Sequence, residues 1–488
     1  MEKFFFAKVS RNEIEIKGDF QVSLGNKLGH VFADWNWDGE KLTVSNDQFG
    51  FQPLFYFREG GKFAISPSLD KILEFTGNRD FNDDAFAVFL RLGWLIGEDT
   101  LFNSINALPP GSVLTWQRGS LKISSQGIIE SKAITISYRE AIETYAELFQ
   151  KSIEKTLHDA EKFYVPLSAG RDSRHILFAL RKAGKMPEAC LTMVHPPPRP
   201  NDDLNIARQI CETLDLKHNS IQQQGSRFSN ETRKNKLTGF VSYENGWFLA
   251  LGTFIDELSQ TAFGDRVMVY DGIAGGVLSS GLFLTKERID LYEQGKFEEL
   301  ADKIFNPEGY IPALLTKDLY QRFSRERAIN YLIKELIRHA DQANPVDSFF
   351  FWNRTRRCIA PCPFRLLGSS ADVVTPFLDR DVFNFLTSLP ADILVDRQFH
   401  TKTIAFAYPD YAHIPYENTD SPLNLENAGF RRFSRDILKY SLTRRNQNLI
   451  DRKFLVSRTM RGIFDKTYGP ALTDFSSQAI HLLQLERL

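Results

Sequence analysis

Cysteine is scarce in this chain, because its 488 residues include only four: Cys190, Cys211, Cys358 and Cys362. Four cysteines are too few to form a disulfide scaffold for a chain of this length. Cys358 and Cys362 are four residues apart, so a metal or redox pair has to be considered. No second Cys/His pair stands nearby at ligand spacing, and we therefore favour buried thiols.

The chain also lacks long apolar runs and a large net charge. The apolar run near the start, Phe4–Ala7, is far too short for a signal sequence or a membrane span, so we expect a cytoplasmic protein. The formal net charge is −1, which gives no overall attraction to nucleic acid or to an anionic membrane. We expect neither as a partner. The length allows about two to four domains.

The Walker sequence G-x-x-x-x-G-K-[ST] is absent, but residues 163–180 carry another pattern typical of phosphate binding. Residues 163–167 are apolar and predict a short buried strand, Ser168–Gly170 predict a turn, and helical periodicity follows. Small residues let the backbone approach an anion, toward which the next helix would direct its unpaired N–H groups. Ser173 would add a hydroxyl donor, and Arg171 and Arg174 would add positive charge.

Asp172 is the acidic member of this loop, and a carboxylate beside a phosphate site is explained if a metal ion lies between them. The residues therefore indicate a nucleotide phosphate and Mg²⁺ site, with an ordinary serine-rich turn as the alternative. The loop resembles the S-G-G-x-D-S pyrophosphate loop of ATP pyrophosphatases, particularly the synthetase domain of asparagine synthetase-like enzymes. Ala169 stands where the second position of that loop is usually Gly.

Residues 1–125 are predicted to be mainly β-structure. Period-2 alternation is clearest at Glu13–Ile16, and Gly60-Gly61 predicts a hairpin turn. A helix is predicted at Asp83–Leu92, with Asn82 as its N-cap. Residues 125–137 are polar and lack a strong pattern, so we place a domain boundary there, and an amphipathic helix is predicted over residues 138–157.

Three stretches of the first domain resemble the glutaminase domain of class B asparagine synthetases, in the same order. They are Asn46–Tyr56 (D-x-x-G-x-x-P-L-Y-Y), Ser66–Leu73 (S-x-x-K-x-L) and Leu101–Ser112 (T-x-F-x-x-I-x-x-L-P-P-G). That family uses an N-terminal Cys as nucleophile, whereas residue 2 here is Glu2, and a carboxylate cannot replace the thiolate. The resemblance thus implies a degenerate glutaminase domain that supplies no ammonia.

A second strand and helix follow the loop, at Cys190–Val194 and Leu204–Leu214, with Asn201 before the helix as its cap. Two such units predict a parallel sheet, whose ligands bind at the carboxyl ends of its strands. The helix resembles the family's D-x-x-x-A-x-x-x-A segment. By that resemblance Met193 and Val194 would lie near the adenine, and a plain core strand is the alternative.

Residues 267–281 form an apolar strand that runs into a glycine-rich turn. Asp271-Gly272 falls where the family contacts ATP, and Asp271 is close enough in sequence to supply a second metal-binding carboxylate. Two positions depart from the family. Ile273 stands where asparagine synthetase has Glu and β-lactam synthetase has Tyr, and Gly276 stands where the second Mg²⁺-binding Asp would be.

Two basic features lie further along the chain. Lys402 falls on the Lys of the family's K-x-x-L-R-x-A helix, which implies stabilisation of developing charge, while Phe406 replaces the Arg. The stretch Phe430–Lys466 has eleven Lys/Arg against three Asp/Glu. It would suit an acidic substrate, peptide or carrier domain, although a solvated helical face is the favoured interpretation.

The resemblance spans nearly the whole chain and implies an α/β protein in two parts. Residues 1–125 would form a β-rich, Ntn-hydrolase-like degenerate glutaminase domain, and residues 126–488 an adenine-nucleotide α-hydrolase-like (PP-loop) synthetase domain with a parallel sheet. The layout is closest to β-lactam synthetases, carbapenam synthetases and lasso-peptide cyclases. The implied reaction is AMP- and pyrophosphate-forming amide synthesis, using ATP and Mg²⁺ to activate a small-molecule or peptide carboxylate for attack by an amine.

Two other functions stay open: a catalytically decayed nucleotide-binding or scaffolding protein, and an ammonia-dependent asparagine synthetase. The expected catalytic residues are Asp172 and Lys402, and the expected metal ligands are Asp172 and Asp271. The residues expected to bind ATP and pyrophosphate are Leu167, Ser168, Ala169, Gly170, Arg171, Asp172, Ser173, Val194, Asp271 and Gly272.

Overall fold

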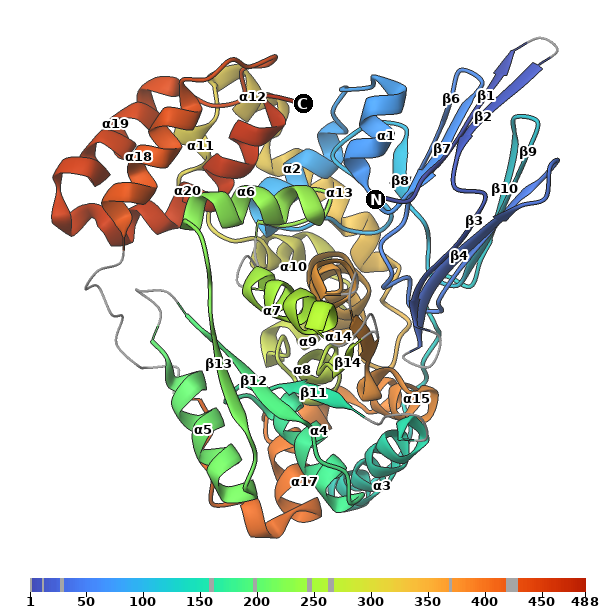
Figure 1. Ribbon diagram of the computed structural model, residues 1–488, viewed down its shortest axis with the longest axis vertical. Helices are drawn as coiled ribbons and strands as arrows, with labels where there is room; N and C mark the ends of the chain where they lie inside the picture. Colours follow the sequence, from blue (N-terminus) through green and yellow to red (C-terminus); the bar gives the residue numbers. More distant parts are fainter. Residues whose placement is uncertain are drawn as a thin grey trace.

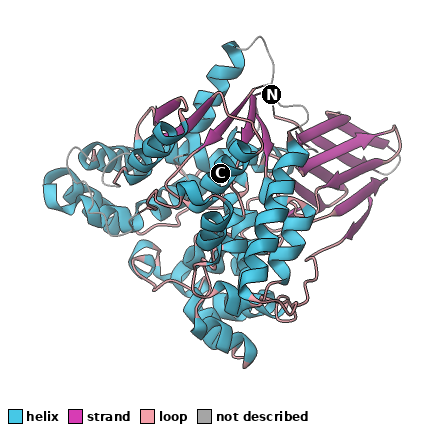
Figure 2. Cartoon of the chain, turned by 90° about the horizontal axis from the view of Figure 1, so that it is seen from below, coloured by secondary structure: helices cyan, strands magenta, loops and turns pink. Residues whose placement is uncertain are grey.

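The computed structural model describes residues 2–10, 13–26, 30–157, 162–195, 200–243, 248–261, 267–367, 371–417 and 429–488. The N-terminal strands lie at the upper right of Figure 1, and a second group of strands lies among helices below them. Seen from below, the strands again gather in two places, and helices make up most of the rest (Figure 2).

The first domain is built from two five-stranded antiparallel sheets, with strand orders β2-β1-β7-β6-β8 and β10-β9-β5-β4-β3. Inward-facing side chains of both sheets, such as Phe63 on β7 and Trp116 on β9, share one apolar cluster. The strands are β1 (Phe5–Ser10), β2 (Glu13–Gly18), β3 (Gln21–Asn26), β4 (Val31–Trp37), β5 (Leu42–Asn46), β6 (Phe55–Glu59), β7 (Lys62–Ser66), β8 (Ile105–Ala107), β9 (Ser112–Gln117) and β10 (Ser120–Ser125).

The hairpin turn and the helix N-cap predicted for this domain are both confirmed. Gly60 and Gly61, with φ of +57° and +75°, join β6 to β7 as the predicted hairpin turn. Two helices, α1 (Leu69–Thr76) and α2 (Asp83–Leu92), lie between β7 and β8 in the chain. The Asn82 side chain accepts a hydrogen bond from the Ala85 N–H and caps α2.

A five-stranded parallel sheet forms the centre of the second part, in the order β13-β12-β11-β14-β15. Its strands are β11 (Phe163–Pro166), β12 (Ala189–Val194), β13 (His218–Gln222), β14 (Val267–Tyr270) and β15 (Ala371–Val374). The chain runs outward from β11 to one edge and then returns to place β14 on its other side. The segments after β11 and β14 therefore meet at the switch point where such sheets bind ligands.

Helices surround this sheet and fill the C-terminal part. They are α3 (Tyr138–Thr156), α4 (Arg171–Lys182), α5 (Asp202–Leu214), α6 (Arg227–Leu237), α7 (Phe248–Thr261), α8 (Gly275–Ser279), α9 (Lys286–Glu293), α10 (Phe297–Ile304), α11 (Ile311–Leu314), α12 (Lys317–Arg322), α13 (Arg325–Ile337), α14 (Pro345–Phe350), α15 (Arg380–Ser388), α16 (Ala391–Leu394), α17 (Phe399–Ala407), α18 (Phe430–Ser441), α19 (Arg452–Phe464) and α20 (Gly469–Leu485). Two π-helices, η1 (Phe351–Ile359) and η2 (Cys362–Leu367), and three 3₁₀ helices, η3 (Pro376–Leu378), η4 (Pro409–Tyr411) and η5 (Lys466–Tyr468), complete the set.

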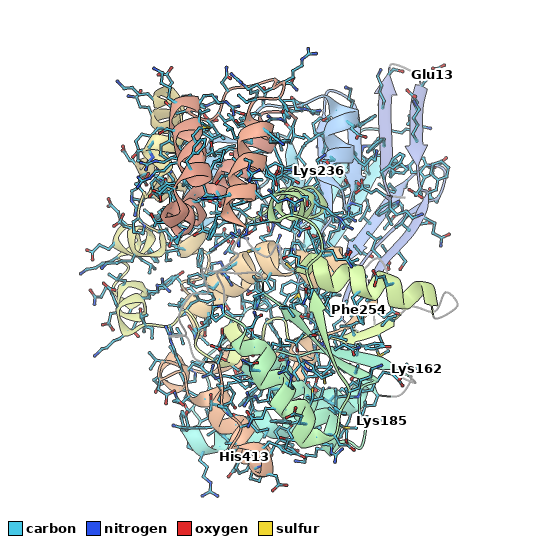
Figure 3. All side chains as sticks on the ribbon, turned by 60° about the vertical axis from the view of Figure 1, so that its left-hand side comes forward. Glu13, Lys162, Lys185, Lys236, Phe254 and His413 are labelled. Carbon is cyan, nitrogen blue, oxygen red and sulfur yellow. The ribbon has the colours of Figure 1, made fainter. Side chains whose placement is uncertain are left out.

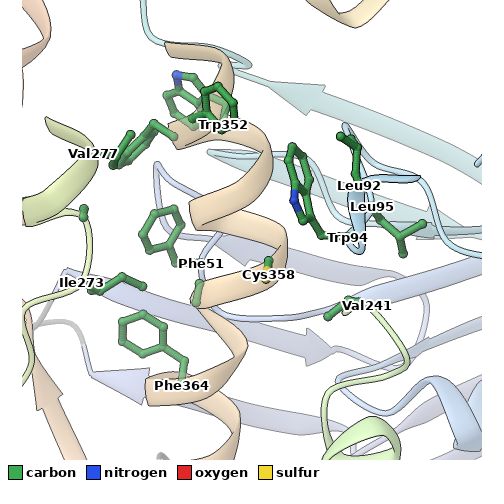
Figure 4. Close-up of a cluster of buried hydrophobic side chains, with 14 of the residues drawn as sticks. Phe51, Leu92, Trp94, Leu95, Val241, Ile273, Val277, Trp352, Cys358 and Phe364 are labelled. Atoms are coloured by element: carbon green, nitrogen blue, oxygen red, sulfur yellow. The ribbon is translucent and has the colours of Figure 1, made fainter. Parts of the chain in front are cut away.

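One apolar core joins the two parts of the chain, with members from Phe6 to Leu485. Figure 4 shows Phe51 and Trp94 of the first part beside Trp352 and Phe364, which lie on the π-helices. The ring centroids of Phe51 and Phe364 are 6.4 Å apart. Strand β10 ends at Ser125 and α3 begins at Tyr138, but the boundary at 125/126 stays a prediction because the core is shared.

All four cysteines are buried thiols, as the sequence predicts. Among the described helices, none has the length and continuous apolar character that crossing a membrane requires.

A buried carboxylate organises the turn after β5. Asp47 is 1% exposed and accepts hydrogen bonds from the backbone N–H groups of Phe49 (2.9 Å), Phe51 (3.2 Å), Gln52 (3.3 Å) and Phe32 (3.3 Å). Burial raises its pKa to about 6, against the opposing effect of these donors. The carboxylate therefore shapes the turn that carries the two aromatic rings into the shared core.

We expect Asp47→Ala to destabilise the protein by about 3 kcal/mol, because the substitution leaves buried N–H groups without an acceptor. Thermal unfolding followed by calorimetry measures the change. Asp38→Ala is the control, since Asp38 also accepts two backbone N–H groups, from Glu40 and Lys41, but in an exposed turn. Equal losses of stability in the two variants would contradict the assigned role of Asp47.

Candidate active site

The loop between β11 and α4 has the form expected of an anion site. Gly170 occupies the N-cap position of α4 with φ −69°, and no side chain caps the helix there. The Ser168 N–H donates to the Ser173 hydroxyl at 3.1 Å, and the Gly170 N–H donates to the Ser168 hydroxyl at 3.1 Å. Two hydroxyls and the start of a twelve-residue helix therefore meet at this turn.

Asp203 holds this loop from the neighbouring unit of the sheet. Its carboxylate accepts the Ala169 N–H at 2.8 Å and lies 3.2 Å from His195 Nε2. Asn201 stands at the N-cap position of α5, as expected, but its side chain accepts the His195 N–H and makes no capping hydrogen bond to the helix. Sequence reasoning missed Asp203 and His195, although Asp203 begins the D-x-x-x-A segment that ends at Ala207.

Asp172 lies against the glycine-rich turn after β14. Its Oδ2 accepts the Gly276 N–H at 2.9 Å. A Cβ atom added at Gly272 would lie 2.8 Å from Asp172 Cβ, and one added at Gly275 would lie 2.6 Å from Asp172 Cγ. Because no real Cβ fits at such distances, these two glycines permit the close approach of the turn and α4.

Two carboxylates face the same cavity at this point. Burial raises the pKa of Asp172 to about 7, assisted by repulsion from Asp271 and opposed by the Gly276 N–H and Arg171. Burial raises the pKa of Asp271 to about 6, although its carboxylate accepts the Ile273 N–H at 2.8 Å. Such a pair fits a divalent cation, which would favour the charged form of both groups.

A magnesium ion here would depend on few protein ligands. Among the described residues, no group of three or more His, Cys, Asp or Glu side chains is arranged to hold a metal. Magnesium is commonly bound by one or two carboxylates together with substrate phosphates, so Asp172 and Asp271 fit that mode. The Asp172 side chain is 31% exposed, which leaves it accessible from the cavity.

Helix α17 reaches the site through His400. Its Nδ1 lies 3.5 Å from Asp172 Oδ1 and 2.9 Å from the Ser279 hydroxyl, and its Nε2 lies 3.0 Å from His175 Nδ1. Burial lowers the pKa of His400 to about 3, so the ring is neutral. The neighbouring Thr401 hydroxyl accepts the Arg171 Nε–H at 2.6 Å. Helix α17 is thus fixed to the start of α4.

Lys402 does not lie at the site, contrary to the sequence expectation. It is two residues beyond the buried His400, or about 200° around the helix, and therefore points the opposite way. Its side chain is 52% exposed, with Nζ 3.6 Å from Asp396 and 4.8 Å from the centre of the Tyr138 ring. It is not among the residues that line the cavity.

The cavity beside these groups has a volume of about 360 Å³. In Figure 3, Phe254 marks α7, which crosses the middle of the molecule and packs against β12–β15. Six of the expected ATP-binding residues line the cavity: Leu167, Ser168, Asp172, Ser173, Asp271 and Gly272. Ala169, Gly170 and Arg171 shape the loop without lining it.

Val194 is a further correction. Met193 lines the cavity, whereas Val194, the last residue of β12, is not among the lining residues. The adenine side of the site would therefore be formed by Met193 together with Leu191 and Thr192.

Arg354 is the cation in the lining of this cavity, and sequence reasoning missed it. Arg354 and Ile359 lie five residues apart on η1, and both line the cavity, because a π-helix brings residues i and i+5 to one side. The Arg354 guanidinium carbon is 5.3 Å from the centre of the Phe283 ring. Residues 285–360 are rich in charge and have amphipathic helical spacing throughout, so the sequence gives no signal that singles out this position.

The basic stretch at residues 430–466 forms α18 and α19, away from the parallel sheet (Figure 1). Several of its cations have partners within the chain: Arg452 pairs with Glu486, and Arg461 pairs with Asp465 at 3.2 Å. An acidic partner for this surface stays a prediction.

Comparison with known proteins agrees with this description of the first part. Residues 25–126 match the family model of the glutamine amidotransferase domain. The first part is therefore a glutamine amidotransferase-like domain, and the predicted fold class is confirmed. The second part has a parallel sheet with a phosphate-type loop at its switch point, which is the predicted adenine-nucleotide α-hydrolase-like arrangement.

The solved structures that match this chain have low sequence identities and low TM-scores. NMN synthetase from Francisella tularensis is 16% identical with a TM-score of 0.22, and the match covers 45% of this chain and 93% of that one. The NH₃-dependent NAD synthetase from Campylobacter jejuni is 14% identical with a TM-score of 0.19, covering 41% and 96%. The allosteric regulatory enzyme of purine biosynthesis is 11% identical with a TM-score of 0.15, covering 52% and 56%. No curated protein matches this chain significantly.

We expect Asp203→Ala to weaken ATP binding about tenfold, because the Ala169 N–H would lose its acceptor and the loop its fixed shape. Isothermal titration with ATP and Mg²⁺ measures the affinity. Asp202→Ala is the control, since Asp202 precedes it on α5 and does not line the cavity. Equal affinities in both variants would remove Asp203 from the site.

Lys402→Ala is expected to keep the ATP affinity within about twofold of the parent chain, because the ammonium points away from the cavity. The same titration tests this. A loss as large as that of Asp203→Ala would restore the role implied by the family pattern.

Proposed function

We propose that the protein is an ATP-dependent amide synthetase that forms AMP and pyrophosphate. The observation that carries the proposal is the convergence of the Ser168–Ser173 loop, Asp172 and Asp271 at one end of a single cavity. A carboxylate is a poor electrophile, and transfer of AMP to it creates a good leaving group. A triphosphate site beside a pocket for a second substrate suits this chemistry.

The residues have distinct roles in this scheme. The N–H groups at the start of α4 and the two serine hydroxyls bind the phosphates that depart as pyrophosphate. Asp172 and Asp271 hold Mg²⁺, which would offset the negative charge of those phosphates when bound. A substrate carboxylate oxygen attacks the α-phosphorus and the bond to pyrophosphate breaks. An amine then attacks the activated carbonyl, AMP leaves with the bonding electrons, and the amine proton passes to solvent.

We further propose that the first domain supplies no ammonia. The sequence contains no cysteine before Cys190, so residues 1–189 offer no thiol nucleophile. The Glu2 carboxylate lies 3.1 Å from an Arg365 guanidinium nitrogen on η2, a contact that joins the two parts of the chain. The amine therefore comes from solution or from a partner.

A decayed, nucleotide-binding homologue is the second candidate. Ile273 and Gly276 favour it, because the family's acidic residues are missing at both positions. An ammonia-dependent asparagine synthetase is disfavoured by Ile273, which brings an apolar side chain into the cavity.

The test is to supply ATP, Mg²⁺ and a panel of carboxylic acids and to measure pyrophosphate exchange and AMP. We expect both activities, and we expect Asp172→Asn to reduce exchange by at least about a hundredfold because a metal-binding charge is lost. Asp410→Asn is the control, since Asp410 is exposed on η4. ATP binding without AMP formation for every acid in the panel would favour the decayed homologue instead.

A further inference from the structure

The cavity has an apolar end that the binding of ATP phosphates does not use. Leu251, Ile273, Val277, Leu282, Phe283 and Ile359 line it. Ile273 and Val277 belong to the turn and helix that follow β14, and they are 5% and 4% exposed. Figure 4 shows both side chains within a cluster of buried apolar residues. This end is therefore a formed apolar wall.

The charged and apolar ends meet at Gly276. A Cβ atom added there would lie 3.5 Å from Asp172 Oδ2 and 3.9 Å from Leu282 Cδ2. A molecule packed against Leu282 thus has one end beside the carboxylate that, under the proposed function, lies next to the metal and phosphates. Leu282 is 47% exposed, so this part of the wall is open to an incoming molecule.

Arg354 brings positive charge to a cavity whose lining also includes Asp172, Asp203 and Asp271. Its guanidinium carbon lies 5.3 Å from the centre of the Phe283 ring, within the range of a cation–π contact. A guanidinium has five N–H donors, of which a bidentate carboxylate takes two. The lining thus combines one carboxylate-binding cation with apolar surface on several sides.

We propose that the acid activated by this protein has an apolar body and a single carboxylate, which Arg354 binds and orients. This inference rests on the proposed function and narrows its substrate class. The apolar body packs against Ile273, Val277 and Leu282. An amino-dicarboxylic acid such as aspartate fits this apolar surface poorly, because Ile273, Val277 and Leu282 offer no partner to its second carboxylate or its ammonium.

The experiment uses the full chain with Mg²⁺ and the non-hydrolysable analogue α,β-methylene-ATP, and titrates phenylacetate, hexanoate or aspartate by calorimetry. We expect phenylacetate and hexanoate to bind at least about tenfold more tightly than aspartate. Leu282→Ser should weaken phenylacetate about tenfold, whereas Leu442→Ser, the same change at an exposed site on another surface, should leave it unchanged. Tighter binding of aspartate, or no binding of either apolar acid, would overturn the inference.

Arg354→Gln should weaken phenylacetate at least about tenfold, and Arg354→Lys should recover part of the loss, because it keeps the charge but not the fork of donors. An affinity for α,β-methylene-ATP equal to that of the parent chain would show that the site of each variant is still folded. Unchanged phenylacetate binding in Arg354→Gln would overturn the role of Arg354. Binding of apolar acids without pyrophosphate exchange would refute the proposed function alone, whereas exchange only with aspartate would refute this inference alone.

Discussion

The site depends on the close approach of the start of α4 to the turn after β14. Asp172 accepts the Gly276 N–H, and Gly272 and Gly275 leave room where a side chain would collide with Asp172. Substituting either glycine would separate the two segments, because Asp172 is already in contact with both positions. Strands β11 and β14 are neighbours in the sheet although they lie far apart in the sequence. The segments that follow them bring Asp172 and Asp271 to the same cavity.

Much of this arrangement could be predicted from the sequence, because it depends on local patterns. The strand before Ser168, the helix after it and the glycine turn at residues 272–276 each have a composition with one favoured structure. The parallel sheet was predicted from two consecutive strand–loop–helix units, whereas the order of its strands comes from the structure. Asp172 and Asp271 could both be named because each lies in a turn after an apolar strand, in a stretch that resembles an ATP-binding segment of the family.

The residues that sequence reasoning misplaced or missed lie on helices distant in the chain. Lys402 was assigned by a family pattern, but the direction of a helical side chain depends on rotation, and His400 faces the site instead. Arg354 lies on a π-helix, whose i to i+5 spacing differs from the 3.6-residue period used to read amphipathic faces. A small error in the assumed rotation of a helix about its axis is enough to assign an exposed residue to the cavity lining.

The same π-helix explains how a domain without a thiol nucleophile still contributes to the site. The Gly97 N–H of the first domain donates to the Asn353 side chain at 2.7 Å, and Arg357 donates to the carbonyls of Gly97 and Asp99. These contacts flank Arg354 on η1, and the Phe51 ring packs 5.3 Å from that of Phe351. The first domain thus fixes the helix that forms one wall of the cavity.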